Sequence, residues 1–267
     1  MNICSEYCFL PDGAVLPDES IKVLGIHAEG FYFLIHKDNE VLYAGLGSFR
    51  NGISEEAIKG ILNIKPSWKI SGFDRIVIQP LSFAAVPNEI LLDISEKELF
   101  QMVDVLPDTC RIIKTKLDKS DSGLLSAYYI EDLNILSQFV LHNNEIEDVV
   151  GTWFNKLKSN GKENIAHLLV FPSSFVIAVF SKEKLHLINS FSYSDKNSFL
   201  YYLLGAVKSC NINPENTDLM VCGEISKSSI LTNAVAPYFS GIDFNSIENK
   251  SNEESTVKIT SLLYPLF

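Results

Sequence analysis

The chain repeats one layout of apolar runs, and this repeat constrains its fold more than any other feature. Three runs open the first copy, at Ile21–His27, Phe31–Lys37 and Glu40–Leu46, and three open the second, at Ile165–Phe171, Ser174–Phe180 and Lys184–Ser190. The matching runs are offset by about 144, 143 and 144 residues. An amphipathic segment and a further apolar run follow each trio. This repetition predicts two similar lobes with a cleft between them.

The spacing within each trio predicts antiparallel strands. Short turns such as Ala28–Gly30 and Lys37–Asn39 separate the runs of the first copy, whereas parallel neighbours would need a longer crossover. The runs are almost continuously apolar, as is typical of strands that are buried on both faces.

The rest of the first copy has clear helix and strand signals. Ser54 is a predicted N-cap for a helix that ends before Pro66, and a buried strand follows at Arg75–Gln79. A further strand is expected around Phe83–Val86. Ser95 opens another helix, with Glu98 completing a capping box.

The middle of the chain predicts a hairpin, two helices and a linker. The hairpin strands are expected at Arg111–Leu117 and Leu124–Ile130, and the helices at Glu131–Val140 and Glu147–Lys158. Ser159–Gly161 is the best linker candidate. We therefore expect a first lobe over residues 1–160, with an extended lead-in over 1–20, and a second lobe over 161–267.

The second copy continues in the same order as the first. Ser194 or Asp195 caps a helix of period 3.6, a strand follows at Asp218–Cys222, and Ser226 is expected to cap a further helix. A solvated loop is predicted over residues 245–257, and an apolar tail over 261–267.

Charge and cysteine content limit the environment and the partners. The net charge of −11 argues against binding to nucleic acid or to an anionic membrane surface. Five scattered cysteines do not suggest a disulfide framework and favour a reducing compartment. No basic leader is present, and the longest apolar stretch, Phe199–Val207, is far shorter than the ~20 residues that span a bilayer. We expect a cytoplasmic protein without direct membrane insertion.

Three antiparallel strands, a helix, a parallel strand and another helix resemble the ribonuclease-H-like unit. Two such units in tandem resemble the actin-like ATPase fold, and the chain is similar to an uncharacterised bacterial family with that fold. The family is distantly similar to pilus-assembly and cell-division members, and the segment Ser198–Tyr238 resembles the end of the pilus-assembly members. The resemblance implies an α/β protein of two lobes, each a mixed sheet flanked by helices. It also implies a site for ATP and Mg²⁺ in the interlobe cleft.

In that fold each lobe offers an Asp-x-Gly turn to phosphate, and this chain departs from the pattern. The first turn keeps Gly30, but His27 stands near the position of the aspartate. The second turn, Phe171–Ser174, has neither aspartate nor glycine, and Pro172 lacks an amide donor. Gly223 is the one glycine of the adenosine loop, and Glu224 after it would repel phosphate if it faced the cleft. Gly30 and Gly223 thus remain as cofactor-binding candidates.

Several side chains near these turns have a chemical and a structural interpretation. Glu29 could hold a metal or be a solvated turn residue, and His27 and His167 could be bases or strand histidines. The Ser173-Ser174 pair could supply a nucleophile, although no nucleophile elbow surrounds it. Cys4 and Cys8 form a lone pair of possible metal ligands. The structural interpretation is favoured in each case, so no catalytic residue and no metal ligand is predicted.

These observations favour a non-catalytic actin-like protein that binds or scaffolds protein partners and has degenerate phosphate loops and no cofactor. The alternative is an enzyme or switch that uses ATP with Mg²⁺, or another phosphorylated ligand, in the interlobe cleft.

Overall fold

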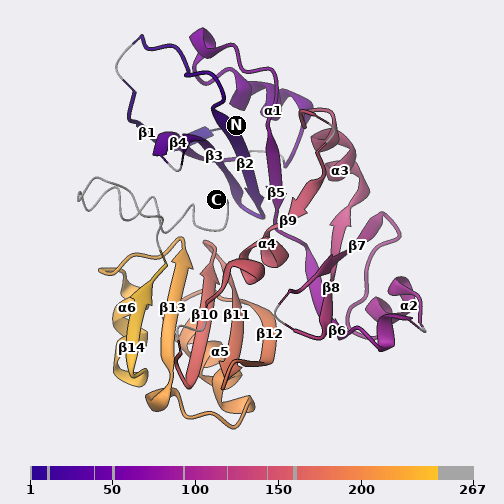
Figure 1. Ribbon diagram of the computed structural model, residues 1–267, viewed down its shortest axis with the longest axis vertical. Helices are drawn as coiled ribbons and strands as arrows, with labels where there is room; N and C mark the ends of the chain where they lie inside the picture. The colour runs from indigo at the N-terminus through magenta and orange to yellow at the C-terminus, as the bar shows by residue number, and fades with distance from the viewer. Residues whose placement is uncertain are drawn as a thin grey trace.

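Both predicted trios of strands belong to mixed sheets in the computed structural model (Figure 1). The structure describes residues 2–10, 13–38, 40–49, 52–92, 94–118, 120–142, 144–158 and 161–245. The loop predicted beyond Asn245 and the apolar tail at 261–267 lie outside these residues, as do two of the three linker residues.

The first sheet has six strands in the order β1-β4-β3-β2-β5-β9. Their bounds are Asn2–Cys8 (β1), Ile21–His27 (β2), Gly30–Lys37 (β3), Glu40–Ser48 (β4), Arg75–Ile78 (β5) and Ile146–Asp148 (β9). Strands β2, β3 and β4 pair antiparallel, and β5 pairs parallel with β2. The predicted lead-in contains β1, which pairs antiparallel with β4.

The second sheet has five strands in the order β12-β11-β10-β13-β14. They are Asn164–Val170 (β10), Ser174–Ser181 (β11), Lys184–Ser192 (β12), Asp218–Gly223 (β13) and Gly241–Phe244 (β14). The order β12-β11-β10-β13 repeats β4-β3-β2-β5, with the same antiparallel and parallel pairings. The internal repeat of the sequence is therefore a repeat of topology.

A small sheet is built from the middle of the chain. Its order is β6-β8-β7, with bounds Ser82–Pro87 (β6), Cys110–Lys116 (β7) and Ser122–Tyr129 (β8). The predicted hairpin is β7–β8, and β6 joins it on the other side of β8.

Helices follow the predicted signals closely. They are Glu55–Leu62 (α1), Glu96–Gln101 (α2), Ile130–Ser137 (α3), Val149–Lys156 (α4), Lys196–Ser209 (α5) and Ile230–Val235 (α6), with 3-10 turns at Pro66–Trp68, Ile90–Leu92, Pro214–Asn216 and Ala236–Tyr238. Ser54 and Asp195 cap α1 and α5, and Ser95 forms its capping box with Glu98. The cap of α6 is Ser229 instead of Ser226, whose carbonyl accepts the hydroxyl of Thr232.

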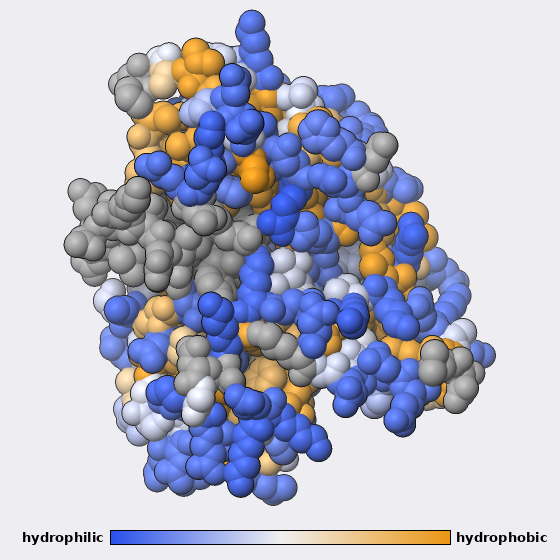
Figure 2. Space-filling view, viewed as in Figure 1, coloured by the Kyte–Doolittle hydropathy of each residue, from blue (hydrophilic) through white to orange (hydrophobic). Residues whose placement is uncertain are grey.

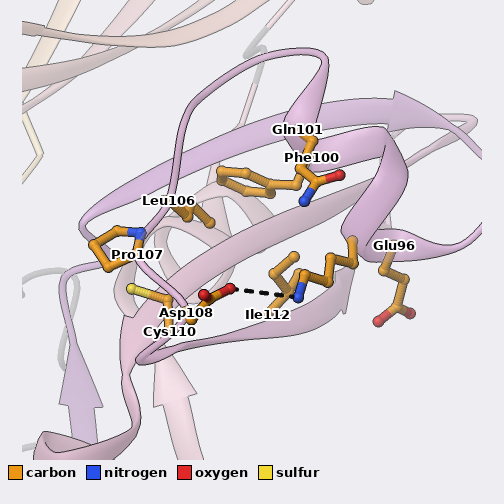
Figure 3. A pocket seen from close by; sticks show the side chains of 9 residues that line it. Glu96, Phe100, Gln101, Leu106, Pro107, Asp108, Cys110 and Ile112 are labelled. Atoms are coloured by element: carbon orange, nitrogen blue, oxygen red, sulfur yellow. Dashed lines mark ion pairs between the residues drawn. The ribbon is translucent and has the colours of Figure 1, made fainter.

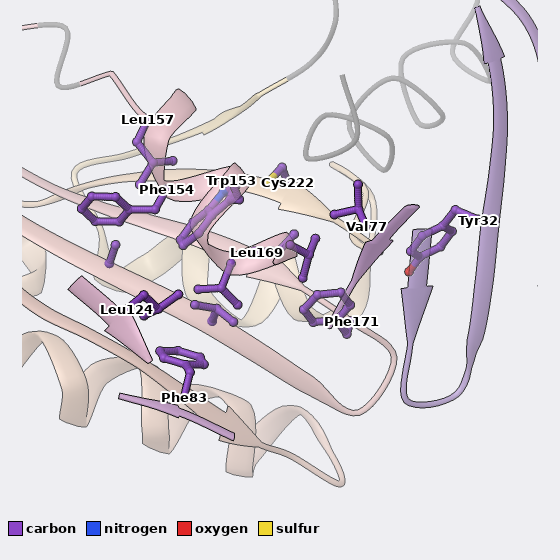
Figure 4. Packing of buried hydrophobic residues seen from close by; sticks show 14 of the residues in the cluster. Tyr32, Val77, Phe83, Leu124, Trp153, Phe154, Leu157, Leu169, Phe171 and Cys222 are labelled. Carbon is purple, nitrogen blue, oxygen red and sulfur yellow. The ribbon is translucent and has the colours of Figure 1, made fainter. Parts of the chain in front are cut away.

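The two large sheets pack on opposite sides of α4. Leu24 and Ile26 of β2 face α1 and α3, whereas Val23 faces the cluster around Trp153 of α4. That cluster also contains Ile165 and Leu169 of β10, so one apolar core joins the first sheet, α4 and the second sheet (Figure 4). Helices α5 and α6 cover the outer face of the second sheet. This arrangement brings the β2–β3 turn next to the β10–β11 turn.

None of the helices among the described residues combines the length and the apolar character that crossing a bilayer requires.

Candidate functional site

The two turns that were predicted to face the cleft touch each other directly. The Ser173 hydroxyl of the β10–β11 turn donates to the carboxylate of Glu29 in the β2–β3 turn. Gln79, just after β5, donates from Nε2 to Ser174 Oγ at 3.2 Å, and its Oε1 accepts the N–H of Ala28 at 3.2 Å. We call this set of side chains, together with His27, Tyr32 and Glu224, the interlobe contact.

Tyr32 and Glu224 make a second link between the lobes. Tyr32 lies on β3, and its hydroxyl donates to Glu224 Oε1 just after β13 at 2.5 Å. Burial, and then the negative charge of Glu224, raise the pKa of Tyr32 well above its usual range. The phenol therefore stays protonated and remains a donor to the carboxylate, a charge-assisted hydrogen bond.

His27 lies between the two carboxylates. Its Nδ1 is 3.3 Å from Glu29 Oε2, and its Nε2 is 3.9 Å from Glu224 Oε1. The ring stacks on Tyr32 with centroids 4.6 Å apart. Burial lowers the pKa of His27, although Glu224 and Glu29 act in the opposite direction. His27 is a buried residue at the end of β2, as the structural interpretation expected.

Gly30 and Gly223 each have a steric reason to be glycine. A Cβ on Gly30 would overlap the carbonyl oxygen of Gly47 on the neighbouring strand. Gly223 has φ +96°, and a Cβ there would overlap the carbonyl oxygen of Val170. That carbonyl also accepts the N–H of Glu224 at 2.7 Å. Both positions are explained by strand packing without any phosphate ligand.

Sequence reasoning located the turns but missed three of the side chains near them. Tyr32 and Gln79 were not identified, nor was Tyr193, whose hydroxyl donates to the Phe171 carbonyl at 2.6 Å. Burial, followed by the charges of Glu224 and Glu29, raises the pKa of Tyr193 to about 12. No motif marks these residues, and only their places beside the turns could have drawn attention to them. Glu29 was expected to be solvated, yet it is half-buried and hydrogen-bonded.

The interlobe contact contains two carboxylates and several donors that already have partners. The carboxylates are those of Glu29 and Glu224, and the hydroxyls of Ser173 and Tyr32 and one N–H of Gln79 donate within the protein. The burial of His27 disfavours its cationic form. Among the described residues, no group of three or more His, Cys, Asp or Glu side chains is arranged to hold a metal ion.

Comparison with solved structures identifies the fold. A protein of unknown function with an actin-like ATPase fold from Bacteroides thetaiotaomicron VPI-5482 aligns with a TM-score of 0.70 and 17% identity, covering 93% of this chain and 99% of that chain. A chain of the PilM-PilN type IV pilus biogenesis complex aligns with a TM-score of 0.53 and 10% identity, covering 92% and 96%. Identities this low speak for the fold alone, and they bear out the actin-like ATPase fold that the sequence suggested.

Comparison by sequence gives the family. No curated protein matches the chain. The family model described as "Protein of unknown function (DUF3822)" matches residues 24–242, which include strands of both large sheets. The chain therefore belongs to the DUF3822 family, within the actin-like ATPase fold.

Proposed function

We propose that this protein is a non-catalytic binding or scaffold protein in which side chains, in place of a nucleotide, hold the two lobes together. The observation that carries the proposal is the direct hydrogen bond from Ser173 to Glu29. These residues belong to the two turns that, in the resemblance to the actin-like fold, approach phosphate from opposite lobes.

The electrostatics of the interlobe contact support this proposal. Glu29 and Glu224 each accept a hydrogen bond across the lobe boundary, from Ser173 and from Tyr32. A phosphate placed between the turns would break these bonds and lie beside two carboxylates whose charge it could not neutralise. Loss of a hydrogen bond to a charged group costs ~1.5–3 kcal/mol. The free energy of nucleotide binding would therefore have to offset the loss of both bonds.

The alternative is that ATP with Mg²⁺, or another phosphorylated ligand, binds through backbone amides near Gly30 and Gly223. Both residues border the contact, and the fold is one that holds nucleotide in many of its members. Binding by this route requires the turns to separate first, because the side chains now fill the space between them.

The remaining features of the proposal concern organisation and location. We place the lobe boundary between α4 and β10, at residues 160–161, and we place the protein in the cytoplasm with protein partners. The net charge of −11 disfavours nucleic acid as a partner. Partnering within this fold has a precedent in the PilM-PilN complex, whose chain shares the architecture.

Titration calorimetry with Mg²⁺-ATP, paired with thermal unfolding in the same buffer, tests the proposal. We expect no saturable heat and no change in the unfolding midpoint at millimolar nucleotide. A ligand that binds only the folded state must raise that midpoint, because at a hundredfold excess over its Kd it adds ~2.7 kcal/mol to the free energy of unfolding. A saturable heat with a raised midpoint would establish the alternative. The Glu224→Gln variant should then bind more tightly, because it removes one repulsive charge.

A further inference from the structure

A pocket opens on the small sheet, away from the interlobe contact. It has a volume of about 190 Å³ and lies between α2, the segment that follows α2, and β7 (Figure 3). Phe100, Leu106, Pro107, Cys110 and Ile112 supply its apolar lining. The volume is several times the ~30 Å³ share of a water molecule, so the pocket has room for an aliphatic side chain.

Exposed apolar residues stand beside this pocket. Met102, Val103 and Val105, in the segment between α2 and β7, are 74%, 60% and 92% exposed. Figure 2 shows some apolar residues among hydrophilic ones on the right-hand side, where Figure 1 places the small sheet and α2. Several large apolar side chains exposed within one short segment are costly in water unless a partner covers them.

Among the residues that the structure describes, strand β7 forms an edge of the small sheet. Strand β8 pairs with one edge of β7. At the opposite end of the small sheet, β6 contacts β12 of the second large sheet. The Ile130 N–H donates to the Thr109 carbonyl at 2.9 Å, so the backbone groups of Thr109 face β8. This orientation alternates along an antiparallel strand, so the backbone groups of Ile112 and Lys114 point outward, away from β8.

Two contacts agree with this direction of the backbone. The Cys110 N–H, which has the same orientation, turns back to the Pro107 carbonyl at 3.0 Å. The Lys116 carbonyl accepts Asn155 Nδ2 at 3.0 Å. Within the described part of the chain, the amides and carbonyls of Ile112 and Lys114 have no strand on their outer side.

The edge is also basic, which limits what can pair with it. Arg111, Lys114 and Lys116 are exposed, and β7 contains no acidic residue. Lys116 pairs with Asp118 at 3.6 Å, and Lys97 with Asp108 at 3.8 Å beside the pocket. A second copy that paired β7 with β7 would bring three basic residues of each strand into one pair of strands, without an acidic partner on either. An acidic strand would instead find complementary charge.

We propose that β7 binds an extended acidic segment of a partner protein as a fourth strand of the small sheet. One aliphatic side chain of that segment fills the pocket beside Ile112, and its carboxylates pair with Lys114 and Arg111. Ile112 and Lys114 share one face of β7, and Arg111 lies on the other. The segment therefore needs one carboxylate two residues from the aliphatic side chain, for Lys114, and one next to it on the other side, for Arg111. This surface is separate from the interlobe contact, so the inference does not depend on whether a nucleotide binds.

A short peptide with one leucine, a glutamate next to it and a second glutamate two residues away on its other side is the probe, and the same peptide with lysine for glutamate is its control. Binding is followed by fluorescence anisotropy, and backbone protection by amide hydrogen exchange in NMR spectra. We expect the acidic peptide to bind and to slow exchange at Ile112 and Lys114. Arg111 and Ile113 should change little, because their amides already pair with β8.

Charge and apolar surface are tested separately with variants. Lys114→Glu should weaken binding by about tenfold, since it replaces an attraction by a repulsion. Val105→Ser should weaken it as well, whereas Val15→Ser, which changes a valine 80% exposed elsewhere, should not. These side chains are exposed, so the variants are expected to fold.

Three outcomes would overturn the inference. One is that the acidic and basic peptides bind equally well, or that neither binds at millimolar concentration. Another is binding without protection of Ile112 and Lys114. The third is a concentration-dependent dimer in sedimentation that the Lys114→Glu change removes, which would assign the edge to a second copy of this chain.

Discussion

The replacement Gly223→Ala tests whether this glycine is required by the backbone. Its φ of +96° is a region that residues with a Cβ seldom adopt, and the new Cβ would overlap the Val170 carbonyl. The left-handed backbone costs ~1–2 kcal/mol, and overpacking against a fixed neighbour costs ~1–3 kcal/mol. We therefore expect Gly223→Ala to lower the free energy of unfolding by about 2–5 kcal/mol.

Two other glycines separate these contributions. Gly13 has φ +79° with nothing within 4 Å of an added Cβ, so Gly13→Ala should cost the backbone contribution alone, ~1–2 kcal/mol. Gly205 lies in α5 with open space around its Cβ position and no positive φ. Gly205→Ala should stabilise the protein by about 0.5–1 kcal/mol, because alanine favours the helix.

Urea denaturation followed by circular dichroism measures all three variants under one condition. The expected order of stability is Gly205→Ala above the parent chain, then Gly13→Ala, then Gly223→Ala. If Gly223→Ala proved as stable as the parent chain, the steric explanation of Gly223 would be wrong. A role in ligand binding would then become the better explanation of this glycine.

Two further predictions concern the core and the pH dependence. Trp153→Ala should cost ~3–5 kcal/mol in one cooperative urea transition, because Trp153 is fully buried in the core that joins both large sheets; two separate transitions would contradict this coupling. The pKa of His27 is lowered on folding, so its contribution to stability is lost as the pH falls below its unfolded value of ~6.5. His27→Gln should therefore reduce the loss of stability between neutral and mildly acidic pH, and an unchanged pH profile would argue against a buried neutral His27.

The sequence predicted the main elements because their signals are local. Ser54, Ser95 and Asp195 are followed at once by helical apolar spacing, and all three cap helices. The cap of α6 was placed at Ser226 because several serines precede that helix, and the choice among them depends on hydrogen bonds that sequence does not reveal. Here Thr232 bonds to both Ser226 and Ser229, and the helix begins after Ser229.

Short strands and interlobe partners were harder to predict. Strand β9 has three residues, and two of them, Glu147 and Asp148, were assigned to the following helix because so short a run has no period of its own. β1 was taken as a lead-in, since its side chains are mostly exposed and give no apolar pattern. Glu29 and Ser173 were both singled out, but their contact arises from the packing of both large sheets on α4. That packing depends on residues far apart in the chain.

The coupling between Tyr32 and Glu224 tests most directly whether side chains hold the lobes together. Tyr32→Phe, Glu224→Ala and the double variant form a cycle measured by urea denaturation, with and without Mg²⁺-ATP. Tyr43→Phe is the control partner, because its hydroxyl bonds to Glu6 at 3.2 Å, in a different part of the first sheet. We expect a coupling free energy of about 1.5–3 kcal/mol for Tyr32 with Glu224, near zero for Tyr43 with Glu224, and no effect of nucleotide. A Tyr32–Glu224 coupling of zero, or stabilisation by Mg²⁺-ATP, would contradict the proposed interlobe contact.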